Sequence, residues 1–354
     1  MKHDINKLLR MMKEKNASDI HISAGSPVQL RIDEKLFPMD DNSLSPDESK
    51  ELVYSMISES QIKKFEQNLE LDMAFGLPDV GRFRVNVFKQ RGTIGASIRI
   101  IPHTIWSFEE CGLPVDVVMN LCEKPKGLVL VTGATGSGKT TSLASMVDWV
   151  NRNRSCHIVT VEDPIEFVHT NKKSIVGQRE VYSDTYSFGA ALKHVLRQDP
   201  DVILVGEMRD LETIESALII AETGHLVFAT LHTSDCVQTI NRVIDVFPAY
   251  QQQQIRTQVS FVLIGVLSQQ LIPKAKGSGR CLATEVLLVT PAVKSLIRES
   301  KIHQIYSVMQ TSHKEGMKTM NQALYELAQQ RLITYEDAFD RSTDQEDLKR
   351  IFKK

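Results

Sequence analysis

The chain has 354 residues, which is enough for two domains at the usual size of about 100–200 residues each. Its 42% hydrophobic and 24% charged residues are ordinary for a globular protein with sizeable cores. A formal net charge of −2 argues against non-specific nucleic-acid binding as the main activity, although it leaves room for a local basic patch.

The cysteines and the apolar runs argue against a disulfide-rich or membrane-spanning protein. No C-x-x-C pair is present, so the usual zinc spacing is absent, and we expect reduced thiols in a cytosolic protein. The longest apolar run, Phe261–Leu267, is far shorter than the ~20 residues that span a bilayer. The charged N-terminus is unlike a signal peptide. We therefore expect a protein that serves any membrane machine from the cytoplasmic side.

Residues 1–101 predict a small α+β domain. Residues 4–15 predict an amphipathic helix, and the segments SDIHIS, VQLRID and KLFPMD predict brief strands. Ser45-Pro46 begins a second predicted helix that runs to about Ile57, with the serine as its cap. From Leu71 to Ile101 the pattern alternates as in antiparallel strands, with turns at Gly76–Gly81 and Arg91–Gly92.

Residues 102–115, with proline near each end, predict a linker, and residues 116–354 predict a second domain. Its apolar runs GLVLVTG, HIVTVEDP, DVILVGE and HLVFATLHT are separated by helical stretches. That alternation is typical of an α/β domain, a parallel sheet with helices on both faces. From Gln251 onward the sequence predicts mostly helices, with weaker strand signals near Leu267–Ile272 and Ala283–Leu288.

The segment from Gly133 to Thr140 matches the phosphate-binding pattern G-x-x-x-x-G-K-[ST] in full. Its glycines allow backbone N–H groups to point at phosphate oxygens, and Lys139 supplies a positive charge. The Thr140 hydroxyl is the predicted ligand of Mg²⁺, and the following helix points its positive end at the phosphates. We expect ATP to bind the residues of this loop: Gly133, Ala134, Thr135, Gly136, Ser137, Gly138, Lys139, Thr140 and Thr141.

Two further segments place acidic residues where strands are predicted to end. HIVTVEDPIEF carries Glu162, Asp163 and Glu166, and DVILVGEMRD carries Glu207. A hydrolase of this type needs carboxylates there to hold metal-bound water and to activate the attacking water. The alternative for each acid is a helix cap or a surface salt bridge. Periodicity does not decide which acid of the first segment orients water.

His225 and His232 stand at the two ends of one predicted strand, which makes them poor ligands for a single metal ion. Each could be purely structural. His232, at the far end of the strand, is predicted to sense the γ-phosphate, and His225 is a weaker candidate.

Four arginines gather on two predicted strands of the small domain. Arg82 and Arg84 share one face by the two-residue period, and Arg91 and Arg99 follow. They could form a solvated basic edge, or they could reach an ATP molecule and stabilise transition-state charge as arginine fingers.

Taken together, four motifs resemble those of the secretion ATPases that drive type II and type IV secretion and type IV pili. GATGSGKTT, VEDPIEF, VGEMRDLETI and ETGHLVFATLHTSD correspond to their Walker A, Asp box, Walker B and His box. SDIHIS and RIDEKLFPMD are similar to the opening of the pilus retraction branch, and Ala292–Glu299 is similar to its AIRNLIRE element, with differences at Val293, Lys294 and Ser295. Three further features favour that branch: the sequence AETGH, the start directly at the small domain and the lack of a C-x-x-C zinc module.

The resemblance implies a hexameric ring of N-terminal PAS-like and C-terminal RecA-like P-loop domains, with ATP between them. It implies that Lys139 and Thr140 hold phosphate and Mg²⁺, that Glu207 is the Walker B acid, and that Glu166, with Glu162 second, is the catalytic carboxylate. It also implies a His box of His225 and His232, with Arg84 and Arg99 as the preferred fingers.

The leading hypothesis is therefore a cytoplasmic motor that hydrolyses ATP to power pilus retraction and twitching motility at the inner-membrane pilus base. Its implied partners are a membrane platform protein and, indirectly, pilin, with no nucleic acid. Alternatives are a pilus assembly or secretion ATPase, an accessory retraction paralogue, a nucleic-acid translocase and a regulatory module that binds ATP without hydrolysing it.

Overall fold

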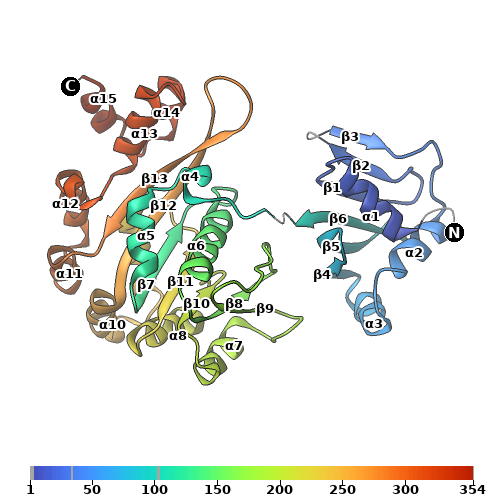
Figure 1. Ribbon diagram of the computed structural model, residues 1–354, viewed down its shortest axis with the longest axis horizontal. Coiled ribbons are helices and arrows are strands. Elements are labelled where there is room, and N and C mark those ends of the chain that lie inside the picture. Colours follow the sequence, from blue (N-terminus) through green and yellow to red (C-terminus); the bar gives the residue numbers. More distant parts are fainter. Residues whose placement is uncertain (1–3, 33–34, 102–103, 354) are drawn as a thin grey trace. The chain divides into compact units, whose positions relative to one another are not determined.

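The computed structural model describes residues 4–32, 35–101 and 104–353, so the first two residues of the predicted linker lie outside the described residues. The chain divides into two compact units (Figure 1). The first contains Met1–Thr104 and Pro164–Val168, and the second contains Ile105–Asp163 and His169–Lys354. Each unit has its own sheet and its own hydrophobic core.

The first unit is an antiparallel sheet with three helices. Its strand order is β3-β2-β1-β6-β5-β4, and every neighbouring pair is antiparallel. The strands are β1 (Asp19–Ile22), β2 (Gln29–Ile32), β3 (Lys35–Pro38), β4 (Glu70–Leu77), β5 (Gly81–Gln90) and β6 (Thr93–Ile101). The helices are α1 (Ile5–Glu14), α2 (Pro46–Tyr54) and α3 (Glu59–Asn68).

The helices of this unit follow from local sequence signals. Four apolar residues of α1 recur at helical spacing and are buried: Ile5, Leu8, Leu9 and Met12. Helix α2 begins with a capping box in which Ser45 accepts from the Glu48 backbone N–H, and with proline at the first helical position. The predicted starts of both helices are confirmed, whereas α2 ends at Tyr54, earlier than predicted. Helix α3 was not predicted.

The predicted turns of the first unit are also confirmed. Arg91 and Gly92 have φ angles of 47° and 80°, and they join β5 to β6, where Gln90 faces Thr93. Positive φ at both central residues matches the twist of a two-residue hairpin. The hairpin fixes the register of β5 against β6, and with it the positions of the arginines on these strands.

The second unit contains a seven-stranded sheet in the order β13-β12-β7-β11-β10-β8-β9. All neighbours are parallel except β12 and β13, which are antiparallel. The strands are β7 (Gly127–Thr132), β8 (His157–Glu162), β9 (Ile175–Glu180), β10 (Val202–Val205), β11 (Leu226–Leu231), β12 (Leu263–Pro273) and β13 (Arg280–Leu288). The prediction of a parallel sheet is confirmed.

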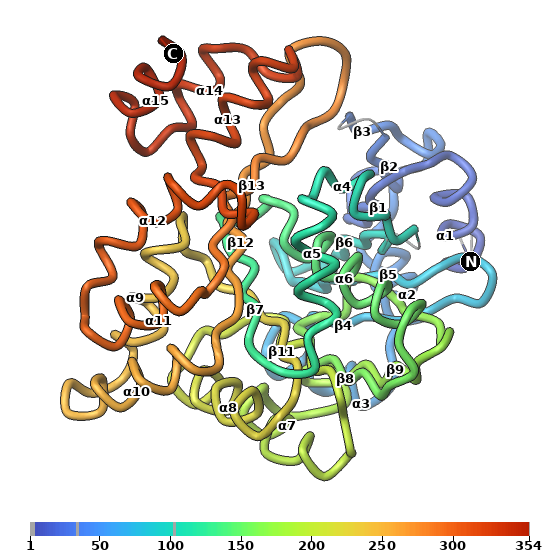
Figure 2. Tube along the Cα trace, turned by 60° about the vertical axis from the view of Figure 1, so that its left-hand side comes forward, coloured from blue at the N-terminus to red at the C-terminus, as the bar shows by residue number. Residues whose placement is uncertain are grey.

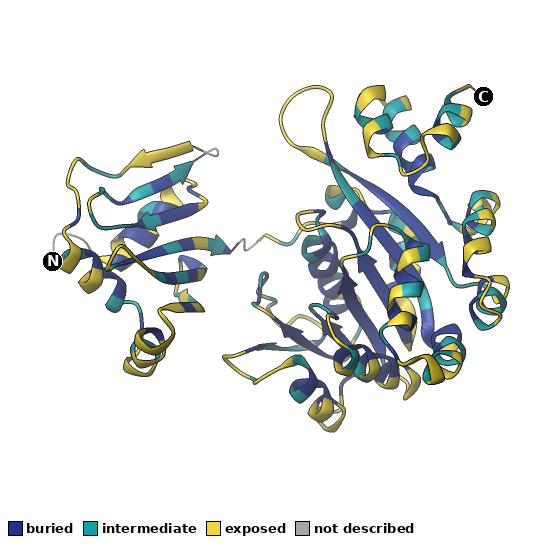
Figure 3. Ribbon diagram, turned by 180° about the vertical axis from the view of Figure 1, so that it is seen from behind, coloured by how far each residue is buried: buried dark blue, intermediate teal, exposed yellow. Residues whose placement is uncertain are grey.

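Helices cover both faces of this sheet, and the central strands are buried along their length (Figure 3). Alternate residues of β11 enter different cores: Leu226 and Phe228 face one side, Val227 and Ala229 the other. On the first side lie α4 (Phe108–Cys111), α5 (Val115–Glu123) and α6 (Lys139–Asn153). On the other lie α7 (Phe188–Val195), α8 (Leu211–Glu222), α9 (Cys236–Asp245), α10 (Ala249–Val262), α11 (Pro291–Arg298) and α12 (Ile305–Thr311).

A third group of helices lies together beside β13 in both ribbon and tube views (Figures 1 and 2). Its members are α13 (Met320–Gln329), α14 (Tyr335–Arg341) and α15 (Gln345–Lys353), and they form a small core with Ile272 and Ala283. None of the helices within the described ranges is long and apolar enough to cross a membrane.

The second unit differs from the sequence-based expectation in three places. Strands β12 and β13 are longer than the weak signals indicated, and β12 begins at Leu263, within the apolar run Phe261–Leu267, whose first two residues end α10. Strand β9 was not predicted, since its sequence IVGQRE has only two apolar residues and ends in three polar ones. Within the predicted linker, Phe108 of α4 is buried and stacks on Trp149 of α6, with ring centroids 6.4 Å apart.

The burial of β11 generates a stability prediction. Phe228→Ala should lower the free energy of unfolding of the second unit by about 3–5 kcal/mol, because the fully buried ring leaves a cavity. The matched control is Phe261→Ala: that ring is 63% exposed, contacts the Arg298 guanidinium and should contribute about 1 kcal/mol or less. Chemical denaturation followed by Trp149 fluorescence measures both. Equal losses would contradict the burial of β11.

Candidate active site

The site forms at one edge of the second sheet. Strands β7, β11, β10 and β8 are neighbours in that order and run in parallel, so their carboxyl ends meet at the same edge. The phosphate loop follows β7, His232 follows β11, Glu207 follows β10, and Glu162 is the last residue of β8. This edge is where open α/β sheets bind ligands. The structure therefore brings these four predicted features together.

The phosphate loop has the backbone conformation that its glycines permit. Gly133, Gly136 and Gly138 have φ angles of 139°, 78° and 91°. Residues Ala134, Thr135 and Gly136 are exposed at the tip, and α6 begins at Lys139. Thr140 and Thr141 stand in the first turn of this helix and are half-buried. A helix N-terminus preceded by such a loop is an anion-binding arrangement.

Lys139 and Ser137 show how the loop is prepared for a ligand. The Lys139 ammonium donates hydrogen bonds to the carbonyl oxygens of Gly133 (2.8 Å) and Ala134 (3.0 Å), so it lies over the loop. The buried Ser137 hydroxyl has no hydrogen-bond partner among the described residues. Buried polar groups normally find partners. An oxygen-rich ligand such as a triphosphate with its metal ion therefore fits this loop.

Glu207 is held by two positively charged or protonatable neighbours. Arg209 Nη2 donates to Glu207 Oε2 (2.8 Å), and His232 Nε2 lies 2.9 Å from Glu207 Oε1. Partial burial by itself raises the pKa of Glu207, but the Arg209 hydrogen bond and the charges of His232 and Arg209 outweigh it and hold the pKa below its usual value. Glu207 is therefore a carboxylate at neutral pH, the form that can ligate a metal ion or orient water.

Close packing of the strand ends positions Glu207. Gly206 accepts a hydrogen bond from the Thr230 hydroxyl on β11, and its N–H donates to Val161 on β8. A Cβ atom on Gly206 would lie 3.2 Å from the Glu162 Cα atom, a tight contact that glycine avoids. The two acids at positions 162 and 207 are thus on neighbouring strands in close contact.

Glu162 is 9% exposed and accepts two hydrogen bonds at the same oxygen. Thr160 Oγ1 donates to Glu162 Oε1 at 2.7 Å, and Gln178 Nε2 donates to it at 3.1 Å. Neither partner was identified from the sequence. Thr160 precedes Glu162 by two residues on β8 and so shares its face, a signal that was available, whereas Gln178 belongs to the unpredicted strand β9.

The described contacts do not place two predicted catalytic residues at these strand ends. His225 precedes β11, at the opposite edge of the sheet from His232, and its Nδ1 is 3.0 Å from the Ile220 carbonyl oxygen. The structure therefore does not bring the two histidines together within one chain. Glu166 belongs to the Pro164–Val168 segment, which groups with the first unit. The catalytic roles of His225 and Glu166 stay predictions.

The predicted arginine fingers lie in a charged row across the sheet of the first unit. Arg31 faces Asp19, Asp19 faces Arg99, and Arg99 faces Arg84 on the consecutive strands β2, β1, β6 and β5. The buried Asp19 carboxylate accepts from Arg99 Nε at 2.7 Å, and the Arg84 side chain is exposed. Asp19 stands between the like charges of Arg31 and Arg99, whereas Arg99 and Arg84 face one another directly. Arg31 is a member of this row that sequence reasoning missed.

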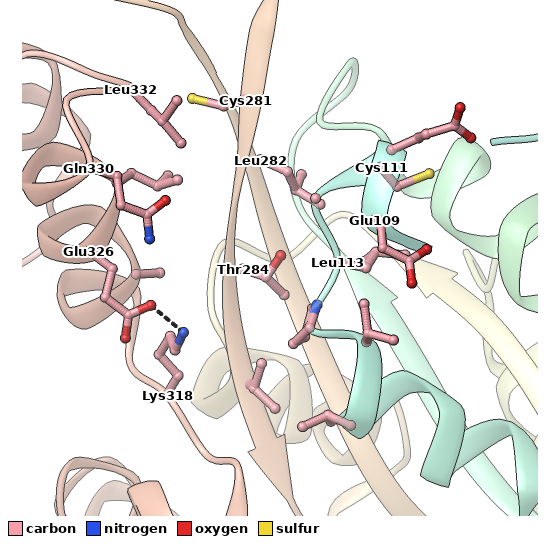
Figure 4. A pocket seen from close by; sticks show the side chains of 18 of the residues that line it. Glu109, Cys111, Leu113, Cys281, Leu282, Thr284, Lys318, Glu326, Gln330 and Leu332 are labelled. Atoms are coloured by element: carbon pink, nitrogen blue, oxygen red, sulfur yellow. Dashed lines mark hydrogen bonds and ion pairs between the residues drawn. The ribbon is translucent and has the colours of Figure 1, made fainter. Parts of the chain in front are cut away.

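A cavity of the second unit has a lining that is separate from these strand ends. It has a volume of about 840 Å³ and lies between α4, α5, β13 and α13, as the labelled residues of Figure 4 show. Its lining includes Leu113, Thr284 and the Lys318–Glu326 ion pair, and within the described chain it includes none of the predicted site residues. The predicted site residues at the strand ends therefore do not line this cavity.

The conformation of the phosphate loop generates a binding prediction. Gly133→Ala should weaken binding of a fluorescent ADP analogue about 10-fold or more, because its φ is 139° and the new Cβ atom would collide with the Gln269 carbonyl oxygen and the Ser137 hydroxyl. Gly277→Ala is the control, with a φ of 80° but no atom within 4 Å, and it should leave affinity within about twofold. Unchanged binding by Gly133→Ala would contradict the described loop.

Comparison with known proteins identifies the family. The family model described as "Type II/IV secretion system protein" matches residues 1–340. The chain is 48% identical over 339 residues to the type IV pilus retraction ATPase PilT of Pseudomonas aeruginosa, covering 96% of this chain and 98% of that protein. It is 42% identical over 350 residues to the type IV pilus ATPase PilU of the same organism, covering 99% and 91% of the two chains.

A solved structure agrees with the sequence relatives. The crystal structure of the pilus retraction motor PilT with bound ADP superimposes with a TM-score of 0.93 at 50% identity, covering 98% of this chain and 99% of that one. The fold is accordingly that of an N-terminal α+β domain joined to a C-terminal α/β ATPase domain. The chain belongs to the type II/IV secretion system protein family.

Proposed function

We propose that this chain is an ATPase that powers retraction of type IV pili. The observation that carries the proposal is the gathering of the phosphate loop, Glu162, Glu207 and His232 at one edge of the second sheet. Retraction, as opposed to another output, is supported by the names of the relatives that match nearly the whole chain.

In this proposal the loop residues bind ATP and the strand-end acids organise its hydrolysis. Backbone N–H groups of Gly133–Gly138 and the Lys139 ammonium hold the phosphates, since N–H groups carry partial positive charge and the ammonium a full one. The Thr140 hydroxyl and the Glu207 carboxylate would hold Mg²⁺ and its water, and the ion would neutralise developing phosphate charge. His232, bonded to Glu207, is placed to detect the γ-phosphate.

The water-activating carboxylate is Glu162 or Glu166 in this proposal. Glu162 is already oriented at the strand ends by Thr160 and Gln178. Glu166 was preferred from the family resemblance and lies four residues further along the chain. Arg84 and Arg99 supply positive charge to an ATP molecule in the assembly, with Arg82 and Arg91 as weaker candidates.

The assembly and location form part of the same proposal. The chain works as a homo-hexamer at the cytoplasmic face of the inner membrane, on a platform protein at the pilus base, and moves pilin indirectly. Hydrolysis then loosens contacts that the γ-phosphate holds, which moves the domains as rigid bodies. The chain would act as the linker where the first unit ends at Thr104 and the second begins at Ile105.

An accessory retraction motor is the second candidate, and the chain is also 42% identical to the type IV pilus ATPase PilU. It uses the same site and the same chemistry. Only the physiological output separates the two, as it separates retraction from pilus assembly or export.

Substitutions in the site test the enzymatic part. Lys139→Ala should abolish ATP turnover and weaken nucleotide binding, whereas Glu207→Gln should lower kcat on the order of 100-fold while nucleotide still binds, because only the charge on the carboxylate is lost. Lys276→Ala, an exposed lysine in the β12–β13 connection, is the control and should retain wild-type turnover. Phosphate release by the purified full-length protein measures each variant. Turnover that survives both site substitutions would refute the assignment.

A strain carrying chromosomal Lys139→Ala tests the physiological output. Loss of a retraction motor should leave abundant surface pili and no twitching, because assembly continues without removal of pilin. Pilus counts by electron microscopy and colony spreading measure the two effects. A strain without pili would indicate an assembly motor, and normal pili with only weakened movement would indicate the accessory role.

A further inference from the structure

The segment Asp163–Val168, which carries Glu166, begins and ends next to one side chain. Gln178 stands on β9 in register with Thr160 of β8. Its Nε2 donates to Glu162 Oε1 at 3.1 Å, just before the segment, and its Oε1 accepts from the backbone N–H of His169 at 2.8 Å, just after it. One amide group therefore closes the two ends of the segment into a loop.

The Glu162 carboxylate that Gln178 contacts is buried, and its hydrogen bonds hold it in one direction. Thr160 is 1% exposed and Glu162 is 9% exposed, and both donors meet the same carboxylate oxygen. Hydrogen bonds to an ionised, buried acceptor are stronger than those between neutral groups. Two such bonds fix the orientation of the Glu162 side chain.

The residues that follow the Asp163–Val168 segment form hydrogen bonds with α6, the helix that follows the phosphate loop. Asn151, in the last turn of α6, donates from Nδ2 to the Thr170 carbonyl oxygen (2.7 Å) and accepts at Oδ1 from the Lys172 N–H (3.0 Å). Helix α6 begins at Lys139. The loop with its acids is consequently anchored to two elements, β9 through Gln178 and α6 through Asn151.

We propose that Gln178 is a positioning residue for hydrolysis: it orients the Glu162 carboxylate and holds the acid-bearing segment in place without touching the nucleotide. The inference rests on the ATPase function proposed above. Glutamine suits the task because its amide offers a donor to the carboxylate and an acceptor to the backbone N–H at once. Glutamate at this position would keep the acceptor and lose the donor, and alanine would lose both.

Steady-state ATP hydrolysis by the full-length chain tests this role. Gln178→Glu and Gln178→Ala should each lower kcat by about 10- to 100-fold, because misplacement of a reacting group by about 1 Å has that effect. KM for ATP and the affinity for fluorescent ADP should change less than about twofold, since the phosphate loop is intact. Thermal unfolding confirms that each variant is folded.

Asn171→Ala is the matched control. Asn171 Oδ1 accepts from the Val176 N–H (2.9 Å) and so holds the same connection to β9, but it has no bond to Glu162 among the described contacts. Its kcat should stay within about twofold of wild type. An equal loss in this variant would show that any weakening of the connection is harmful, and it would overturn the specific role of Gln178.

Four further outcomes decide the inference. Wild-type kcat in Gln178→Glu would show that the donor to Glu162 is unnecessary and would refute it, as would a rise in KM with unchanged kcat. Wild-type kcat in Glu162→Gln would show that hydrolysis does not need the carboxylate that Gln178 orients, and it would also refute the inference. Absence of ATP turnover in the wild-type chain would instead refute the proposed function, and this inference with it.

Discussion

The parallel pairing of β7, β11, β10 and β8 is the constraint on which the site depends. Parallel strands in register place their carboxyl ends at the same level, so residues separated by up to a hundred positions in the chain become neighbours. Gly206 shows how tight this alignment is, because its missing side chain lets β10 approach β8 at Glu162. Without that pairing the acids and the phosphate loop would be unrelated surface features.

At this edge of the sheet, hydrogen bonds and neighbouring charges act on the acidic side chains in addition to burial. Glu207 is kept ionised by Arg209 and His232, although partial burial favours its neutral form. Glu162, more deeply buried, is oriented by uncharged donors, the Thr160 hydroxyl and the Gln178 amide. The two acids therefore have different environments, which suits different tasks: a charged group near metal and water, and a directed group within a polar network.

The division into two units gives the proposed motor its working parts. The second unit contains the phosphate loop and the strand-end acids, and the first contains the row of Arg31, Asp19, Arg99 and Arg84. The register of β5 against β6, set by the Arg91–Gly92 turn, determines that Arg84 stands opposite Arg99. A charged ligand reached by that row would couple the chemistry in one unit to the position of another.

The sequence by itself determined the features that depend on neighbouring residues. It predicted the phosphate loop from glycine spacing, the starts of α1 and α2 from periodicity and capping, the hairpin turn at Arg91–Gly92, and the parallel sheet from alternating apolar runs. The four motifs in order also predicted the family. Only the tertiary structure decided the strand order, which places His232 beside Glu207. It alone revealed β9, a short segment without a clear apolar pattern that forms a strand because β8 supplies hydrogen-bonding partners, and with it Gln178 beside Glu162. Such contacts join residues that are distant in the chain, and no local preference specifies them.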